Sequence, residues 1–367
     1  MKKIGLFIVF FVLIFTFTAC KEKKPQVSSS TPNLESIIDI PKQVFDVNPL
    51  TGIEKSDDYP EGVRPFAIMI NNAPAAMPQS GISSAPVIYE MVTEGGITRL
   101  MAIYDDYTKI GKVGPVRSTR DQFVNFMFPI NAIGVHIGSS IYASEILRAY
   151  NYITLDGYYL GHTTFEQDKN RTANGYANEH TFYTNASLLQ EGLNINSLDV
   201  KGGTIKLFNF VNPNEEEKTP LDGSAKSILF KFSPSAVSGF IYNEATKTYS
   251  KNQFDGVHID EATGLQLNVK NVFIFSCKVE LYPDGFVSKF DLTKGNGLYI
   301  SNGAFEEVTW VKGAPEDRMI IYDKNGDELK VNAGNSYISI VDEDVLKQNL
   351  TIDDALFYEN IQKEVAK

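Results

Sequence analysis

Cysteine is nearly absent from this sequence, with Cys20 and Cys277 as its two examples. Two cysteines are too few for a disulfide framework or a thiolate-rich zinc site. Cys277 lies in the apolar, strand-like run Phe-Ile-Phe-Ser-Cys-Lys-Val, which predicts a buried structural thiol. A disulfide between the two cysteines is not expected, because Cys20 has another role, described below.

Complete catalytic and cofactor motifs are also missing. The four histidines are His136, His162, His180 and His258, and no two of them have the i, i+4 spacing of helical metal ligands. The sequence contains no Gly-x-Ser-x-Gly and no Gly-rich phosphate-binding loop. We therefore predict no metal site and no cofactor, and the motifs identify no catalytic residue.

Long hydrophobic runs occur once, at the N-terminus. Lys2 and Lys3 precede the apolar residues 4–19, which end at Cys20. A basic start, a short apolar stretch and a small residue before the cut describe a secretory signal. The tetrad Phe17-Thr18-Ala19-Cys20 is similar to a bacterial lipobox, with Phe17 where leucine is usual. The alternative is an uncleaved anchor with an incidental cysteine.

These features predict a signal peptide at residues 1–19 and lipidation of Cys20, with a diacylglycerol anchor and palmitate-type acyl chains. Residues 20–60 are rich in Ser, Pro, Asn and Asp and predict a flexible tether. The remaining chain is expected at the extracytoplasmic face of the cell membrane. The membrane lipid is then its first partner.

Positive charge is in short supply. The net charge is −11, and removal of residues 1–19 takes away two lysines and no acid, which leaves −13. So acidic a chain is a poor ligand for nucleic acid, and we expect no nucleic-acid partner. Arg117 and Arg120 are a local exception.

The first predicted domain covers residues 61–200. Buried strands are expected at 64–72, 86–92, 98–104 and 132–137, with a hairpin at Gly95-Gly96. Helical spacing predicts helices at 121–128, 143–150 and 186–191, the first capped by Ser118 or Thr119. This order indicates a mixed α/β layer.

The second predicted domain covers residues 201–345. Short β-prone runs alternate there with Asn-Gly and Asp-Gly turns, which is typical of antiparallel sheet. Residues 346–367 predict a C-terminal helix. The fold class is therefore α+β, with a mixed α/β N-terminal domain followed by a mainly antiparallel β C-terminal domain.

The stretch from Val113 to His136 carries the best candidate site. A Gly-Pro turn leads to Arg117 and Arg120 at the start of a predicted helix, whose free N–H groups favour anions. Paired guanidinium groups there suit a carboxylate or a phosphate. The structural alternative is a salt bridge to a local acid such as Asp105 or Glu94, and both interpretations stand.

Other residues join this candidate site through predicted loops: His136, His180, Glu94 and Arg171. His136 follows a strand pattern, where a lone histidine is more often a hydrogen-bonded core residue than a ligand. The carboxylates Glu90, Glu94 and Asp168 leave open a hydrolase that uses His136 or His180, including a glycosidase with two paired acids.

Several long motifs resemble the YerB lipoproteins of Gram-positive bacteria. They are Arg64-Pro-Phe-Ala-Ile-Met-Ile-Asn-Asn, Tyr89-Glu-Met-Val-Thr-Glu-Gly-Gly, Gly114-Pro-Val-Arg-Ser-Thr-Arg, Gly256-Val-His-Ile-Asp and Val308-Thr-Trp-Val-Lys. The resemblance covers residues 64–341 and implies a two-part architecture and an envelope location, but no reaction. One departure is Glu179-His-Thr-Phe-Tyr-Thr, where the family often has Pro-His-Asn-Leu-Tyr-Thr.

The sequence thus predicts a membrane-anchored lipoprotein that binds an anionic or polar ligand near Arg117 and Arg120. A cell-wall fragment or an envelope protein is the expected partner. The alternatives are an envelope hydrolase acting on cell-wall glycan or peptide, and a purely structural interaction protein. Whether the chain is an enzyme stays open.

Overall fold

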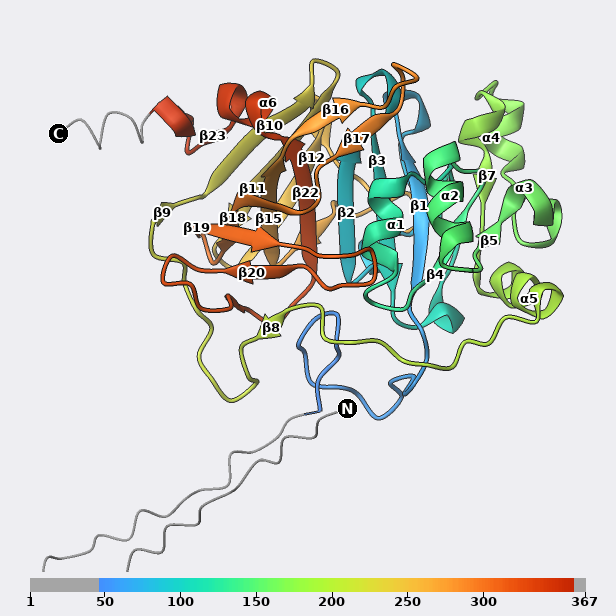
Figure 1. The fold of residues 1–367 in the computed structure, drawn as a ribbon, viewed down its shortest axis with the longest axis horizontal. Helices are drawn as coiled ribbons and strands as arrows, with labels where there is room; N and C mark the ends of the chain where they lie inside the picture. The colour runs from blue at the N-terminus through green and yellow to red at the C-terminus, as the bar shows by residue number, and fades with distance from the viewer. Residues whose placement is uncertain (1–45, 360–367) are drawn as a thin grey trace, which may run out of the picture. The chain divides into compact units, whose positions relative to one another are not determined.

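The computed structural model describes residues 46–359 (Figure 1). The predicted signal peptide at 1–19 and the predicted lipidation of Cys20 lie outside this range. So do residues 20–45 of the predicted tether and residues 360–367 of the predicted C-terminal helix. Within 46–359, no helix is both long enough and apolar enough to cross a membrane.

The first half of the described chain mixes strands with short helices. Its strands are β1 (Phe66–Asn72), β2 (Val87–Val92), β3 (Thr98–Tyr104), β4 (Ile133–His136), β5 (Leu155–Asp156), β6 (Glu166–Gln167) and β7 (Phe182–Tyr183). Its α-helices are α1 (Asp121–Met127), α2 (Ile141–Ala149), α3 (Gly157–Leu160), α4 (Lys169–Ala173) and α5 (Ala186–Asn196). Short 3₁₀ helices are η1 (Pro74–Ala76), η2 (Ile82–Ser84), η3 (Glu94–Gly96), η4 (Tyr107–Lys109), η5 (Gly161–Thr163) and η6 (Asn178–His180).

The second half is almost entirely strand. Its longer strands are β10 (Ser227–Ser233), β11 (Ala236–Asn243), β12 (Thr248–Gln253), β15 (Asn271–Cys277), β18 (Lys294–Ser301), β19 (Ala304–Val311) and β22 (Ser336–Asp342), followed by helix α6 (Glu343–Asn349). Its shorter strands are β8 (Asn209–Phe210), β9 (Gly223–Ser224), β13 (Gly256–Val257), β14 (Asn268–Val269), β16 (Val279–Leu281), β17 (Ser288–Phe290), β20 (Ile320–Tyr322), β21 (Lys330–Val331), β23 (Thr351–Ile352) and β24 (Ala355–Leu356).

One 11-stranded sheet runs through both halves. Its order is β20-β19-β18-β15-β22-β2-β3-β1-β4-β5, with β9 paired to β19. Strand β22, from near the end of the chain, lies between β15 and β2 and is parallel to both. The two halves therefore share a continuous hydrogen-bonded ladder at this seam between β22 and β2.

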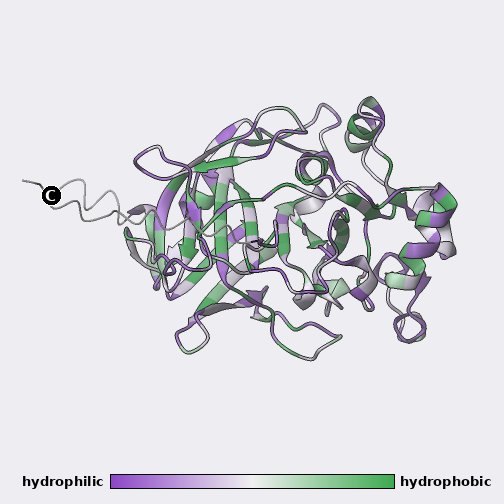
Figure 2. Cartoon of the chain, turned by 90° about the horizontal axis from the view of Figure 1, so that it is seen from below, coloured by the Kyte–Doolittle hydropathy of each residue, from purple (hydrophilic) through white to green (hydrophobic). Residues whose placement is uncertain are grey.

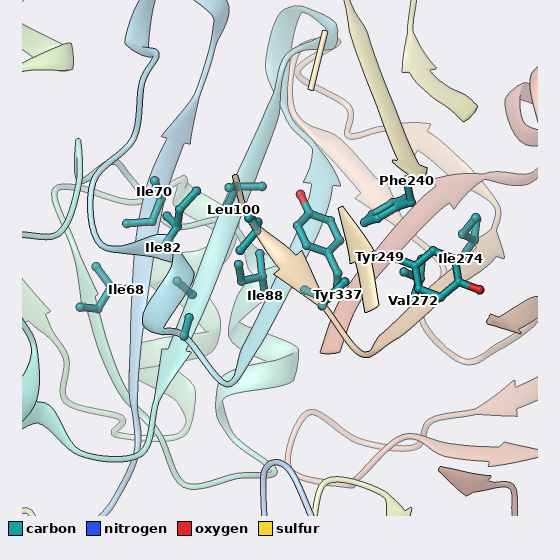
Figure 3. Close-up of a cluster of buried hydrophobic side chains, with 14 of the residues drawn as sticks. Ile68, Ile70, Ile82, Ile88, Leu100, Phe240, Tyr249, Val272, Ile274 and Tyr337 are labelled. Carbon is teal, nitrogen blue, oxygen red and sulfur yellow. The ribbon is translucent and has the colours of Figure 1, made fainter. Parts of the chain in front are cut away.

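A second sheet, in the order β13-β12-β11-β10-β23-β24, packs near the seam and builds the larger core. Figure 3 shows this core extending from Ile68 and Ile88 of the first half to Tyr337 and Ile274 of the second. Phe240 of β11 joins it from the second sheet. Burial of both faces explains why the first five residues of β1, 66–70, are all apolar and do not alternate.

The opposite face of the large sheet carries α1. Phe123 and Val124 of this helix are fully buried, and the ring of Phe126 stacks on Tyr89 of β2 at 4.8 Å between centroids. The hydropathy colouring in Figure 2 follows this arrangement, with hydrophobic residues concentrated along the strands and hydrophilic ones in the surrounding loops. The amphipathic helix predicted at 121–128 is confirmed in this position.

The hairpin expected at Gly95-Gly96 is also confirmed, because β2 and β3 pair antiparallel across η3. Gly95 and Gly96 have φ values of +69° and +74°, a conformation that glycine adopts without strain. The α+β fold class is confirmed as well. The division at residue 200 stays a prediction, because the large sheet is shared between the two predicted domains.

Two predicted boundaries are wrong within the described range. Residues 46–60 are not a flexible tether: Asn48 Oδ1 accepts a 2.8 Å hydrogen bond from the Leu50 amide, and Leu50 is fully buried. The predicted C-terminal helix is interrupted: α6 ends at Asn349, β23 and β24 follow, and residues 357–359 are helical again. Left-handed φ values at Asp353 and Asp354 turn the chain there, and the Asp353 carboxylate accepts hydrogen bonds from the Lys226 and Ser227 amides.

Candidate functional site

The segment from Val113 to Arg120 runs as extended chain between β1, β7 and the loop that follows β4. The Val116 amide donates to Phe182 O at 2.7 Å, and the Arg117 amide donates to Met69 O at 2.9 Å. The Thr119 amide donates to Gly138 O at 3.0 Å. Backbone hydrogen bonds on both sides of this segment therefore fix the backbone positions of Arg117 and Arg120.

Arg120 is held by Glu94, which lies in the turn between β2 and β3. Arg120 Nη2 donates to Glu94 Oε2 at 2.8 Å, and Arg120 Nε donates to Glu94 Oε1. The two side chains are 14% and 10% exposed. On the sequence alone, this salt bridge to Glu94 was the alternative to a ligand-binding role for Arg120.

The pair sets the protonation of Glu94. Burial acts to raise the pKa of this carboxyl, but hydrogen bonding and charge from Arg120 outweigh it and lower the pKa. Arg120 itself takes the N-cap position of α1 without a side-chain cap bond, so the predicted capping by Ser118 or Thr119 is wrong. Arg117 lies in the preceding loop and not on the first helical turn.

Arg99 of β3 lies beneath the two predicted arginines and is 2% exposed. It donates from Nη1 to Ser118 O at 2.7 Å, while its Nε has no hydrogen-bond partner among the described residues. Burial first, and then the charges of Arg120 and Arg117, hold the pKa of Arg99 well below its usual range. We call Arg99, Arg117 and Arg120 the arginine cluster.

Arg117 is the most open member of the cluster, with a 32% exposed side chain. Its one ion pair in the described chain is with Glu179, at 3.7 Å from Nη2 to Oε1, and the glutamate side chain is 50% exposed. So long and exposed a pair contributes little stability. Arg117 is therefore available to another anion.

His180 follows Glu179 and lies beside the cluster. Its Nδ1 is 2.8 Å from Nδ2 of Asn71, the second-last residue of β1. Burial lowers the pKa of His180, and the neighbouring Arg117 and Arg171 lower it further against the opposing effect of Glu179. The structure thus brings Glu94, Arg117, Arg120 and His180 together at one end of β1 and β3.

Arg171 has a different position from the one expected. It is 4% exposed, and its guanidinium donates to the backbone oxygens of Ala76, at 2.8 Å, and Pro78. It also donates to His180 O at 3.3 Å, and its charge lies over the ring of Tyr176. Arg171 therefore supports the loops around the cluster and is not open to a ligand.

Among the described residues, the His136 ring makes no hydrogen bond to the arginine cluster. It is 1% exposed on β4, with Nδ1 2.9 Å from Gly138 O and Nε2 2.9 Å from Thr154 Oγ1. It lines a cavity bounded by α2, β4 and β5, and Arg117, Arg120 and His180 are not among the residues that line this cavity. The arginines and His136 therefore do not line the same cavity, and a site shared between them stays a prediction.

The acids proposed for a hydrolase are engaged elsewhere. Glu90 is fully buried and accepts hydrogen bonds from five side chains, Glu94 holds Arg120, and Asp168 pairs with Lys112. Within residues 46–359, neither His136 nor His180 hydrogen-bonds to any of these three acids. The expected acid–histidine sets are therefore not assembled.

Two contributors were missed as site residues. Neither Arg99 nor Asn71 was among the predicted site residues. Successive side chains of a strand point to opposite faces, so Arg99 shares a face of β3 with the buried Met101 and Ile103. This spacing could have marked Arg99 as a buried arginine. Among the described residues, no group of three His, Cys, Asp or Glu side chains could hold a metal ion.

Comparison with known proteins agrees with this two-part architecture. Residues 50–199 match the family described as "Protein of unknown function (DUF3048) N-terminal domain", and residues 228–338 match its C-terminal domain. "Putative lipoprotein YerB" of Bacillus subtilis (strain 168) is 27% identical over 305 residues, which cover 80% of this chain and 85% of that protein.

The fold is likewise similar to a solved structure. The crystal structure of YerB protein from Bacillus subtilis superposes with a TM-score of 0.70 at 25% sequence identity. The match covers 80% of this chain and 96% of that one. With both family domains present in order, the chain belongs to the DUF3048 family, to which the YerB-like motifs of its sequence had pointed.

Proposed function

We propose that this protein is a lipid-anchored, extracytoplasmic binding protein whose arginine cluster takes an anionic ligand of the cell envelope. Support for the anchor comes from the Lys2–Cys20 sequence pattern and from the lipoprotein name of the Bacillus relative. Support for the ligand comes from the cluster. A cell-wall fragment with free carboxylates, or an acidic segment of an envelope protein, has the required chemistry.

The observation that carries the proposal is the excess of positive charge around Arg99. Arg120 and Arg117 lie close enough to Arg99 to lower its pKa, while Glu94 and Glu179 provide two carboxylates. Arg99 also keeps an unpartnered buried Nε. A bound anion would relieve this repulsion, since buried donors and like charges are stabilised by an acceptor.

Glu179 then acts as an internal stand-in for the ligand. Its carboxylate lies 3.7 Å from the Arg117 guanidinium. A ligand carboxylate that reaches Arg117 has to displace it. Removal of the Glu179 charge should therefore strengthen anion binding, whereas removal of Arg117 should weaken it.

The test is calorimetric titration of residues 21–367 with a muropeptide that carries free carboxylates. Arg117→Ala should weaken binding about tenfold, and Glu179→Gln should strengthen it several-fold. Arg318→Ala is the matched control, because Arg318 also pairs with a partly exposed glutamate, Glu328 at 2.8 Å, but lies just before β20. Equal affinity of the wild type, Arg117→Ala and Glu179→Gln proteins would overturn the proposal.

Mass spectrometry of the same mixtures separates binding from turnover. Intact muropeptide after prolonged incubation agrees with a binding role, while cleavage would favour the hydrolase alternative. The anchor has its own test in cells. Replacement Cys20→Ser should abolish labelling by a palmitate analogue, and continued labelling would contradict lipidation at this cysteine.

A further inference from the structure

We propose that the cavity lined by His136 is a second binding site, specific for a neutral sugar ring. This inference goes beyond the anion site and uses different residues. The cavity has a volume of about 350 Å³, within the range of small-molecule sites. It is formed where α2, β4 and the start of α3 meet, a region visible at one end of the large sheet in Figure 1.

Hydroxyl groups and a neutral imidazole form much of the polar wall. Thr154 Oγ1 lies 2.9 Å from His136 Nε2, and Ser139 Oγ lies 2.7 Å from Ser144 Oγ. Burial lowers the pKa of His136, which keeps its ring uncharged near neutral pH. Hydroxyls both donate and accept hydrogen bonds, so this wall matches the alcohol groups of a sugar.

The charged residues of the cavity argue against an anionic occupant. Asp156 lines it and accepts hydrogen bonds from the amides of Gly138, at 2.7 Å, and Tyr158, at 2.9 Å. Arg148 also lines it. One carboxylate and one guanidinium give no net charge, and both hydrogen-bond well to neutral hydroxyls.

An exposed aromatic side chain completes the site. Tyr159 lines the cavity and is 83% exposed, which is unusual for so large a ring. Aromatic rings combine an apolar face with a polar edge and pack well against partly apolar ligands. The C–H face of a pyranose is such a partner, and Tyr159 can cover it while the wall binds the hydroxyls.

The neighbouring Tyr158 provides a matched control. It is 78% exposed and lies edge-on to Tyr159, with ring centroids 5.4 Å apart, but it is not among the residues that line the cavity. A sugar stacked in the cavity should therefore depend on Tyr159 and not on Tyr158. Both rings are exposed, so neither substitution threatens the fold.

The experiment is an NMR titration of residues 21–367 with chitotriose, a neutral trimer of N-acetylglucosamine. The wild type should bind in the micromolar to millimolar range, and Tyr159→Ala should weaken binding at least tenfold. Tyr159→Phe, which keeps the ring, and Tyr158→Ala should each stay within about threefold of the wild type.

Absence of binding to the wild type at millimolar chitotriose would overturn the inference. Equal loss of chitotriose affinity in the Tyr158→Ala and Tyr159→Ala proteins would also overturn it, because nonspecific binding to exposed aromatic rings would then explain the result. Arg117→Ala separates the two sites: it should weaken muropeptide binding through the arginine cluster and leave chitotriose binding unchanged. Failure of either site is thereby visible without the other.

Discussion

The hydroxyl of Tyr337 donates a 2.8 Å hydrogen bond to the carboxylate of Glu90, which lies 247 residues earlier in the chain. Both side chains are buried, on the paired strands β22 and β2. The same carboxylate accepts hydrogen bonds from Asn72, Thr98, Ser238 and Gln253. Glu90 thus joins the two halves of the protein through one group.

Loss of this carboxylate should destabilise the whole protein. Glu90→Ala leaves several buried donors without an acceptor, so we expect a fall of about 3–5 kcal/mol in the free energy of unfolding. Urea unfolding, followed by fluorescence and circular dichroism, measures it. Tyr337→Phe should lower the free energy of unfolding more than Tyr104→Phe does. The buried hydroxyl of Tyr104 donates to a neutral backbone oxygen, Gly81 O at 3.1 Å. Equal losses would contradict the role given to Glu90.

Lys251 should make stability rise in mild alkali. It is fully buried near Glu90, and burial lowers its pKa from 10.5 to about 8. As pH rises, the folded protein then releases this proton before the unfolded chain does, so folding is favoured progressively between about pH 8 and 10.5. The expected gain between pH 7 and 9.5 is about 2 kcal/mol.

The measurement compares urea unfolding of the wild type and Lys251→Met across this pH interval. Buried tyrosines such as Tyr89 and Tyr299, whose pKa burial raises, destabilise the fold above pH 10, and the comparison stops below that point. The difference between the two proteins should change with pH. A constant difference would show that Lys251 does not titrate as described.

Glu94 should contribute to the acid limb of the stability curve. Its pKa is lowered by Arg120, so its stabilisation is present above pH 4.5 and is lost as pH falls through the lower folded-state pKa. Glu94→Gln should cost about 1 kcal/mol at pH 7 and little at pH 3. Thermal unfolding at both pH values tests this, and an equal loss at pH 3 would exclude the ion pair as its cause.

Gly114 should be intolerant of any side chain. Its φ is +151°, and a Cβ there would lie 2.8 Å from Phe182 O. Gly114→Ala is expected to cost about 2–4 kcal/mol and to shift the loop that carries Arg117. Gly111→Ala, with no atom within 4 Å of its Cβ, should be nearly neutral. Similar melting temperatures for the two variants would contradict the claim that the backbone at Gly114 excludes a side chain.

Local patterns in the sequence predicted local structure well. The apolar run of β1, the Gly95-Gly96 hairpin and the face of α1 each depend on neighbouring residues, and all were confirmed. The insertion of β22 between β15 and β2 was not predicted, because it depends on pairing between distant segments. A run of β-prone residues does not specify its partner strand.

The candidate site shows the same limit. The sequence named Glu94 as a possible partner of Arg120, and this pairing is present. It grouped His136 and Arg171 with the arginines because all lie in or near loops, but both side chains are buried and hydrogen-bond to backbone oxygens. The direction in which a side chain points from its helix, strand or loop depends on the fold. It cannot be predicted from the residue type alone.

The placement of β22 also decides how this protein can be divided. A fragment that ends at residue 199 keeps every residue of the N-terminal family match, yet it leaves β2 as an open edge of apolar strand. The complementary fragment keeps β22 paired with β15 but leaves the edge of β22 that pairs with β2 open in the same way. Bare edges of this kind pair with other chains, so each half expressed alone should aggregate, whereas co-expressed halves can reassemble through the missing ladder.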